Sequence, residues 1–286
     1  LSPCFFPCRP LPPPSCVAGR SLPRSSGAGT VRPWGSADAA RGWEAVGRLD
    51  SGVSFCSATL VAPDLVLTAA HCLYDENNRR IADHALRFSA GLRNGRAEAI
   101  RRVTRSHVLG AYRATQGPPA MELIARDIAL LELDQPIVSG LVVPIRTGIQ
   151  GRLRDVVTIV SYGRDRESYA SIQQDCEIVG REDAITALTC QVVQGSSGSP
   201  ILRETPSGFE IVAVVSAMGE WNGEDAAFAV DVDALLPAFM AQARPARPNG
   251  SNVVTLRHVA GDGGRGNLGA RLIRPRAGLE RGISTS

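Results

Sequence analysis

Three short stretches of the chain carry residues that together could hydrolyse an acyl bond. His71 lies in the stretch TAAHC, Asp127 in RDIAL and Ser197 in GSSGSP. A serine hydroxyl is a poor nucleophile at neutral pH, so it needs an imidazole to take its proton and a carboxylate to hold that imidazole's tautomer. These residue types predict a nucleophilic serine with its base and its orienting acid.

Each of these residues also has an ordinary structural alternative. The other histidines, His84, His107 and His258, lack the apolar run and the small residues that precede His71. Asp127 could cap a strand or form a surface ion pair, and a Gly-Ser loop alone is ordinary linker composition. The three stretches together favour the catalytic interpretation over these alternatives.

The order His, Asp, Ser with these flanking residues resembles the trypsin-like, chymotrypsin-fold serine proteases. The stretch GSSGSP is more similar to the bacterial V8-like and HtrA-like branch than to trypsin. The resemblance implies that His71 is the base, Asp127 its orienting acid and Ser197 the nucleophile. It also implies an oxyanion hole formed by the N–H groups of Gly195 and Ser197.

The same resemblance implies an all-β fold of two antiparallel six-stranded β-barrels with a C-terminal helix and the site between the barrels. We expect barrel one over residues 43–135, barrel two over 153–232 and the helix over 233–243, with Asp231 or Asp233 as its N-cap. Together these form a protease domain over residues 37–243. Residues 1–36 and 244–286 are rich in Gly, Pro and Arg, and we expect a disordered leader and a disordered basic tail.

Short apolar runs between turn residues give the expected strands. Those of the first half are Ala45–Leu49, Ser57–Ala62, Leu65–Ala69, Leu86–Gly91, Ala99–Val108 and Asp127–Leu133. Those of the second half are Val156–Ser161, Cys176–Gly180, Leu188–Val192, Pro200–Leu202, Phe209–Ala217 and Ala226–Val230. Composition alone supports only an all-β domain followed by a helix.

The chain departs from trypsin just before the nucleophile. Trypsin has an aspartate there, which pairs with a new N-terminus freed by cleavage, whereas this chain has the uncharged Ser196. No Ile-Val-Gly-Gly sequence precedes Trp43 to supply such a terminus. We therefore hypothesise that the oxyanion loop does not depend on trypsin-style activation.

The residues expected to set cleavage preference are uncharged. Gln191, six residues before Ser197, corresponds to the base of the primary specificity pocket, and Val215 stands where glutamate-specific relatives carry a histidine. Neither Arg/Lys nor Glu specificity is supported, which leaves a mild preference for a small or apolar residue. The segment expected to pair with the substrate backbone consists of Ser216, Ala217 and Met218. Ser216 is also a candidate hydrogen-bond donor to Asp127.

Four of the seven cysteines lie outside the expected leader. Cys56 and Cys72 resemble the family's disulfide beside the catalytic histidine, and Cys176 and Cys190 are paired by elimination. No C-x-x-C spacing indicates a zinc or redox site, so we expect no metal and no cofactor. Two disulfides indicate an oxidising, secreted or periplasmic location, although Leu1–Ser15 is too interrupted by proline for a clear signal peptide. The alternative is free buried cysteines in a cytosolic protein.

Charge and hydropathy limit the other function classes. Residues 244–286 carry eight arginines against two acids, but without the interleaved aromatic residues that nucleic-acid binding favours. No apolar run is long enough to span a membrane. We expect a monomer acting on protein or peptide substrates, with no specific nucleic-acid partner. The alternatives are a catalytically silent, protease-like binding protein and a protein that binds anionic polymers through its basic tails.

Overall fold

A computed structural model describes residues 31–33, 41–110, 112–115, 117, 119–164, 166–233 and 236–243. Most of the expected leader, with Cys4, Cys8 and Cys16, and the whole of the expected basic tail lie outside the described residues. Within the expected leader, Arg32–Pro33 form strand β1, which pairs with Ile172 and Ser171. The expectation of disorder over the whole of residues 1–36 is therefore wrong for these two residues.

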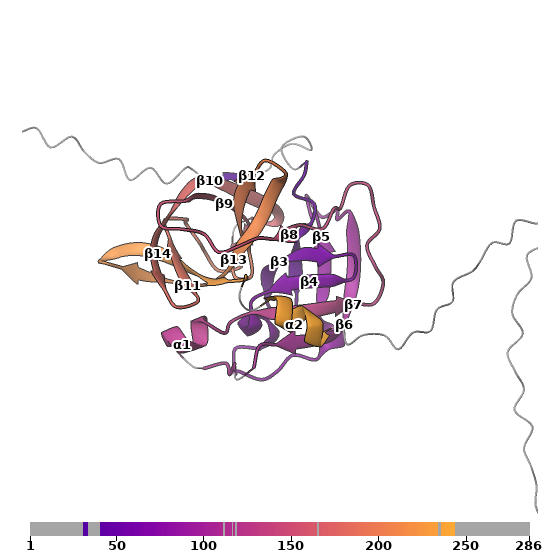
Figure 1. The fold of residues 1–286 in the computed structure, drawn as a ribbon. Coiled ribbons are helices and arrows are strands. Elements are labelled where there is room, and N and C mark those ends of the chain that lie inside the picture. The colour runs from indigo at the N-terminus through magenta and orange to yellow at the C-terminus, as the bar shows by residue number, and fades with distance from the viewer. Residues whose placement is uncertain are drawn as a thin grey trace, which may run out of the picture. The chain divides into compact units, whose positions relative to one another are not determined.

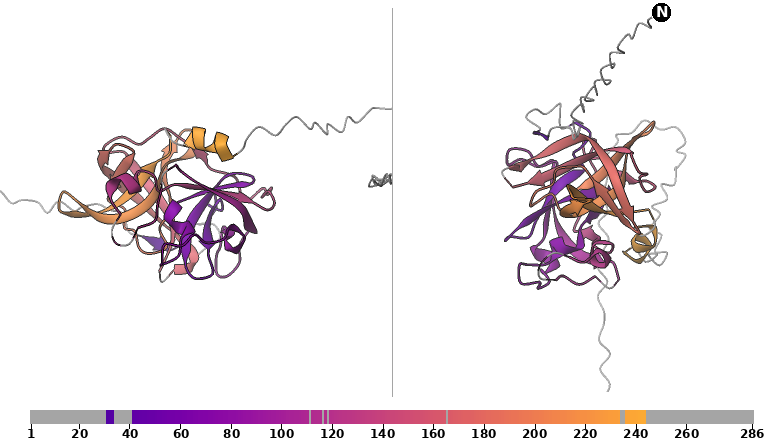
Figure 2. Two further views of the ribbon diagram at one scale, coloured as in Figure 1. Left: turned by 90° about the horizontal axis from the view of Figure 1, so that it is seen from below. Right: turned by 90° about the vertical axis from the view of Figure 1, so that its left-hand side faces the viewer.

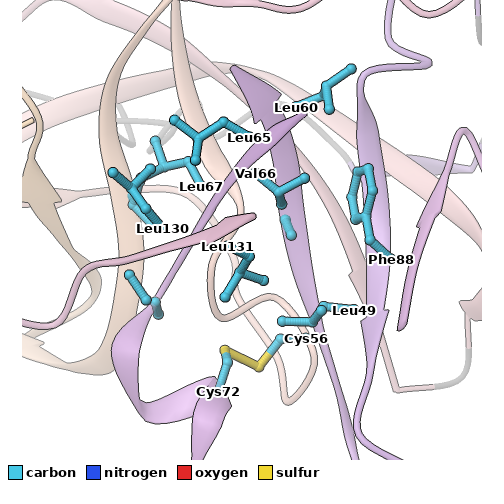
Figure 3. Packing of buried hydrophobic residues seen from close by; sticks show 14 of the residues in the cluster. Leu49, Cys56, Leu60, Leu65, Val66, Leu67, Cys72, Phe88, Leu130 and Leu131 are labelled. Carbon is cyan, nitrogen blue, oxygen red and sulfur yellow. A yellow bond between two sulfur atoms is a disulfide. The ribbon is translucent and has the colours of Figure 1, made fainter. Parts of the chain in front are cut away.

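The first half of the chain closes into a six-stranded antiparallel barrel with the strand order β2-β3-β4-β7-β6-β5 (Figure 1). Its strands are β2 (Val46–Asp50), β3 (Phe55–Ala62), β4 (Leu65–Thr68), β5 (Arg87–Ala90), β6 (Ala99–Val108) and β7 (Ala129–Leu133). Figure 3 shows the side chains that fill it, among them Leu49, Leu60, Phe88 and Leu131, all at most 1% exposed. Burial of these apolar side chains is the main force that closes the barrel.

The second half forms another antiparallel barrel. Its strands are β9 (Val156–Gly163), β10 (Arg166–Glu182), β11 (Ile185–Leu188), β12 (Pro200–Thr205), β13 (Gly208–Trp221) and β14 (Glu224–Asp231). They follow the order β10-β11-β14-β13-β12-β9, and the pairing of β9 with β10 closes the ring. Strand β1 adds to β10, and β8 (Arg146–Thr147) pairs in parallel with β13. The predicted fold of two six-stranded antiparallel barrels is confirmed.

Helices are few and short in the described part of the chain. They are the 3₁₀ helices η1 (Ala70–Leu73) and η2 (Asp83–Ala85) and the α-helices α1 (Met121–Ile124) and α2 (Leu236–Ala243). The last of these corresponds to the predicted C-terminal helix. Although α2 follows barrel two in the sequence, it lies beside β7 of barrel one (Figures 1 and 2). Leu236 and Phe239 are buried in the hydrophobic cluster that includes the core of barrel one.

Two details of the second half differ from the predictions. The strand expected over Leu188–Val192 is wrong, because β11 ends at Leu188 and the chain then leaves the sheet to form the loop before β12. The predicted strand Cys176–Gly180 is only part of the 17-residue β10. Polar residues in the first part of β10 hid its true length.

The proposed N-cap residue Asp231 lies in β14, not at a helix start. Its carboxylate is buried and accepts hydrogen bonds from Thr186 Oγ1 at 2.6 Å and from the Arg181 guanidinium. Burial raises the pKa of Asp231, although the bonds from Thr186 and Arg181 oppose that shift. The carboxylate therefore joins strands β10, β11 and β14 instead of capping α2.

The described residues contain two disulfides. Cys56 is bonded to Cys72 and Cys176 to Cys190, and the partners are 16 and 14 positions apart in the sequence. The first joins β3 to the helix η1 and the second joins β10 to the loop after β11. Loops of this size stabilise the folded chain by about 3 kcal/mol each in the chain-entropy account.

Replacing Asp231 by alanine should lower the free energy of unfolding by about 3 kcal/mol, because the buried Thr186 hydroxyl loses its acceptor and the half-buried Arg181 guanidinium loses its carboxylate partner. The matched control is Asp225→Ala, which removes an exposed carboxylate from the same strand and should change stability by less than about 0.5 kcal/mol. Urea denaturation measures both. Equal losses in the two variants would contradict a structural role for Asp231.

Candidate active site

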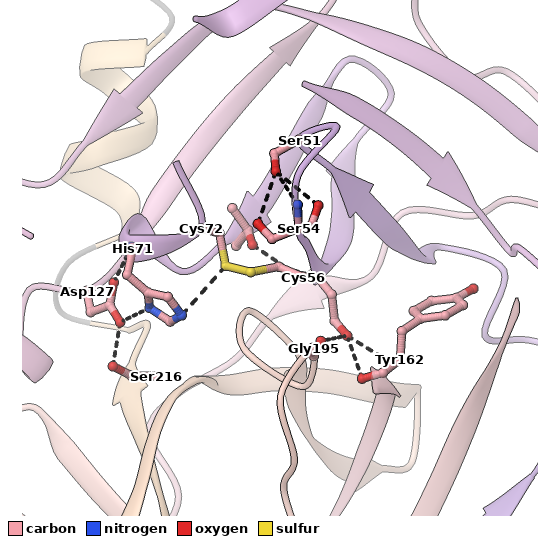
Figure 4. Close-up of a disulfide and its surroundings, with 11 residues drawn as sticks. Ser51, Ser54, Cys56, His71, Cys72, Asp127, Tyr162, Gly195 and Ser216 are labelled. Carbon is pink, nitrogen blue, oxygen red and sulfur yellow. Dashed lines mark hydrogen bonds and ion pairs between the residues drawn. A yellow bond between two sulfur atoms is a disulfide. The ribbon is translucent and has the colours of Figure 1, made fainter. Parts of the chain in front are cut away.

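The carboxylate of Asp127 is the centre of a buried hydrogen-bond network between the barrels (Figure 4). It lies in a turn after α1, where its N–H donates to the Ile124 carbonyl, so β7 begins only at Ala129 and not at Asp127 as predicted. Oδ1 accepts from the backbone N–H of His71 at 2.8 Å, and Oδ2 lies 2.6 Å from His71 Nδ1. Ser216 Oγ donates to the same Oδ2 at 2.5 Å. Asp127 is 3% exposed, so these bonds take the place of its lost hydration.

His71 is held in one tautomer by this carboxylate. Because Nδ1 faces Asp127, it carries the proton, and Nε2 is left as an unprotonated base. Burial alone would lower the pKa of His71, but the charge of Asp127 and its hydrogen bond raise the pKa above its ordinary value of 6.5. Nε2 lies 3.9 Å from Cys72 Sγ, which is bonded to Cys56.

Ser197 lies in the loop between β11 and β12, and its position is set from both barrels. Its carbonyl accepts from the N–H of Ser57, the residue after Cys56, at 2.8 Å. The next residue, Gly198, donates its N–H to the Val215 carbonyl at 2.8 Å, directly before Ser216. One connection to the His71–Asp127 pair runs through Ser57 and the Cys56–Cys72 disulfide next to His71. The other runs through Gly198 and Val215 to Ser216, which binds Asp127. Within the described residues, its Oγ makes no hydrogen bond to His71 Nε2.

The backbone around Ser197 leaves two N–H groups free. The Gln194 carbonyl accepts from the N–H of Arg164 at 2.8 Å, so the N–H of Gly195, on the same trans peptide, points the other way. The Ser196 carbonyl accepts from the N–H of Ser199 at 3.1 Å, so the N–H of Ser197, on the same trans peptide as that carbonyl, also points the other way. In the part of the chain described, neither N–H has an acceptor. Two such donors can bind a developing oxyanion.

Ser57 is a positioning residue that sequence reasoning missed. It is fully buried in β3 of barrel one, and its Oγ donates to the Gly195 carbonyl at 2.9 Å and accepts from the Tyr162 N–H at 2.9 Å. Its own carbonyl accepts from Thr68 Oγ1 at 2.9 Å. No pattern in the sequence separates it from Thr59, the second hydroxyl residue of β3, because Gly195 and Tyr162 reach Ser57 only when the barrels dock. Ser57 therefore connects the loop that carries Gly195 and Ser197, in barrel two, to barrel one.

Ser196 stabilises the same loop through hydrogen bonds of its uncharged side chain and its backbone. It is fully buried, and its Oγ accepts from the Val193 N–H at 3.2 Å and lies 3.5 Å from the Tyr162 carbonyl. The Ser196 N–H also donates to the Val193 carbonyl at 2.8 Å. These contacts close the loop through its own atoms.

The predicted specificity residues belong to barrel two, where Val215 is buried in β13 directly before Ser216. Gln191 is exposed, and its N–H donates to the Oε1 of the buried Gln173 at 2.8 Å. Gln173 was also missed, because a glutamine inside a long strand has no pattern that separates it from a surface residue. Ala217 and Met218 continue β13 after Ser216, and Met218 is 60% exposed.

A metal does not fit the one histidine-containing group of potential ligands found among the described residues. The ligand atoms of Cys56, His71 and Cys72 lie within 4.8 Å of one another. Both sulfur atoms are held in a disulfide, however, and a disulfide sulfur is not a thiolate ligand.

Two β-barrels with a histidine–carboxylate pair and a glycine-flanked serine at their junction define the class of chymotrypsin-like folds. The chain belongs to the trypsin family, whose family model, described as Trypsin, matches residues 33–238. Among solved structures, it is similar to that of a Glu endopeptidase in complex with MPD, with a TM-score of 0.63 and 20% sequence identity. The match covers 76% of this chain and 98% of the other. The predicted family is confirmed.

Alanine at position 198 should damage the site far more than alanine at position 208. Both glycines have positive φ, +79° and +110°, but a Cβ on Gly198 would collide with the Ser57 carbonyl oxygen and Thr68 Oγ1, whereas one on Gly208 meets nothing within 4 Å. We expect Gly198→Ala to cost about 1–3 kcal/mol more than Gly208→Ala in the free energy of unfolding. Similar thermal midpoints for the two variants would contradict this close approach of the barrels.

Proposed function

We propose that this protein is a serine endopeptidase that hydrolyses peptide bonds through an acyl-enzyme. Membership of the trypsin family supports a peptidase. The observation that carries the proposal is that Asp127 binds both the backbone and the ring of His71 and so leaves Nε2 as a free base. Ser197 lies in the loop joined to that pair from both barrels.

The reaction follows from these positions. As Ser197 Oγ forms a bond to the substrate carbonyl carbon, its proton passes to His71 Nε2 and the carbonyl electrons move to oxygen. The N–H groups of Gly195 and Ser197 bind that oxyanion, and Asp127 stabilises the imidazolium. His71 then gives the proton to the leaving amine as the C–N bond breaks. Water, deprotonated by the same nitrogen, hydrolyses the ester and restores Ser197.

We propose a neutral primary specificity. The solved structure similar to this chain is named a Glu endopeptidase, but here Gln191 and Val215 provide no cation for a glutamate side chain and no carboxylate for a basic one. Among the described residues, β12 pairs with β13 only as far as Val214, so Ser216, Ala217 and Met218 pair with β14 alone and keep one backbone edge free. The side chains of Ala217 and Met218 are apolar. These residues favour cleavage after small or apolar side chains.

The bonds around Ser196 support the hypothesis that the oxyanion loop needs no newly freed N-terminus. Its Oγ is engaged by neighbouring backbone groups, so the loop has no buried charge that an α-amino group must neutralise.

The two disulfides support a secreted or periplasmic location, because they persist in oxidising compartments. We also propose that the protein acts as a monomer. None of the helices in the described ranges is long and apolar enough to cross a membrane.

Replacing Ser197 by alanine should abolish cleavage of a peptide library, with a loss of at least about 10³-fold in kcat/KM, because the nucleophile is removed. Ser199→Ala is the matched control from the same loop, since Ser199 Oγ is buried without a hydrogen-bond partner and its loss leaves no group unpaired. It should keep most of the activity. Cleavage that persists in Ser197→Ala, or none in the parent protein, would contradict the proposed function.

The pH dependence of kcat/KM should reflect the pKa of His71. Only the neutral imidazole accepts a proton, so activity should rise with pH and reach half its maximum above pH 6.5, because Asp127 raises this pKa. Asp127→Asn should lower the midpoint and reduce kcat by about 10⁴-fold.

Glu132→Gln provides the matched control for this profile. Glu132 is the carboxylate partner of a different histidine, His107, at 2.7 Å. This change removes a carboxylate of the same kind away from the site, so the midpoint and kcat should stay as they are. If Asp127→Asn and Glu132→Gln shift the pH profile of kcat/KM by the same amount, Asp127 does not set the pKa of His71.

A further inference from the structure

A hollow of about 600 Å³ opens at the end of barrel one, away from the residues assigned to catalysis. It lies between the β2–β3 turn, η2 and the neighbouring strands β5 and β6. Its polar and aromatic lining consists of Asp50, Ser54, Phe55, His84, Arg87 and Arg102.

Two arginines face each other in this lining. Arg87 of β5 is directly opposite Arg102 of β6 in the antiparallel register, so their side chains lie on the same face of the sheet. Like charges directly opposite each other in a sheet are destabilising. In the described structure neither guanidinium forms an ion pair or hydrogen bond, and both residues are exposed. The pair is therefore an unneutralised cationic site.

The acid in the lining does not neutralise the two arginines. Asp50 lies on β2, the strand that pairs with the other edge of β5, and is directly opposite Arg87 there. Its carboxylate, however, is bound twice by Arg48, at 2.6 Å and 3.1 Å. His84, from η2, adds no negative charge. The hollow therefore offers two free guanidinium groups, which bind carboxylates with paired hydrogen bonds.

Phe55 connects this hollow to the oxyanion loop. Its ring lines the hollow and also fills the space beside Gly195, where an added Cβ would overlap the ring. The Arg48 guanidinium lies over this ring, 5.3 Å from its centroid. Ser216, Ala217 and Met218 lie on β13 of barrel two, whereas Phe55 belongs to β3 of barrel one. A substrate paired with the β13 edge would continue past Ser197 toward Phe55.

We propose that the hollow around Arg87 and Arg102 is a binding site for an acidic polypeptide segment on the leaving-group side of the cleaved bond. The assignment to a substrate segment rests on the proposed function; the binding of acidic peptide does not. Carboxylates a few residues beyond the cleaved bond bind the two guanidinium groups and relieve their mutual repulsion.

Binding is tested with fluorescein-labelled hexaglutamate and the full chain, by fluorescence anisotropy at low and high salt. Arg87→Gln/Arg102→Gln should weaken binding at low salt about tenfold. Arg96→Gln/Arg105→Gln, which removes two other exposed arginines of barrel one, should weaken it less than twofold. High salt should weaken binding by the parent protein. Equal losses in both double variants, or no binding by the parent protein, would overturn the site.

The Ser197→Ala protein separates this site from the proposed function, since it should bind hexaglutamate as tightly as the parent does. The thermal midpoint of Arg87→Gln/Arg102→Gln should equal or exceed that of the parent, because a repulsive pair is removed. A thermal midpoint below that of the parent would contradict the claim that the two arginines repel each other without a neutralising partner.

The substrate assignment is tested with two peptides that are identical up to the cleaved bond and continue with four glutamates or four glutamines. The parent protein should cleave the glutamate peptide about tenfold more efficiently in kcat/KM, and the ratio should fall to about one in Arg87→Gln/Arg102→Gln. A ratio unchanged by these substitutions would overturn the assignment, even where hexaglutamate still binds.

Discussion

The hydrogen bonds that converge on the Asp127 carboxylate are the constraint on which the site depends. An ionised carboxylate that is almost fully buried is stable only when its oxygens are paired. Here one oxygen holds the His71 backbone, and the other holds the His71 ring and Ser216. Because His71 belongs to barrel one and Ser216 to barrel two, satisfying this single charge requires both barrels to be docked.

The loop that carries Gly195 and Ser197 depends on the same docking through a second set of bonds. Ser57 of barrel one binds the carbonyls of Gly195 and Ser197, and the absence of a side chain at Gly198 lets the two barrels approach. Ser196 completes the loop with local backbone bonds. The docking of the two barrels therefore positions His71, Ser197 and the N–H groups of Gly195 and Ser197, to which we assign the roles of base, nucleophile and oxyanion donors. A change at the barrel interface should disturb all of them.

The sequence was most informative where chemistry needs a residue type in a particular order. Three stretches and four cysteines predicted the family, the fold and both disulfides, because short-range patterns carry that information. Strand ends were less predictable: Asp127 starts no strand, since its backbone completes the turn after α1. Ser57, Gln173 and the Arg87–Arg102 pair could not be predicted, because each depends on partners brought together by strand register or barrel docking.

The most direct test of the central claim, that Asp127, His71 and Ser197 act as one unit across the barrel interface, is to map a fluorophosphonate adduct by mass spectrometry. The account predicts a single phosphonyl group on Ser197. It also predicts that Asp127→Asn slows this labelling by orders of magnitude, although the Ser197 hydroxyl is still present. An adduct on another serine, or labelling at an unchanged rate in Asp127→Asn, would contradict it.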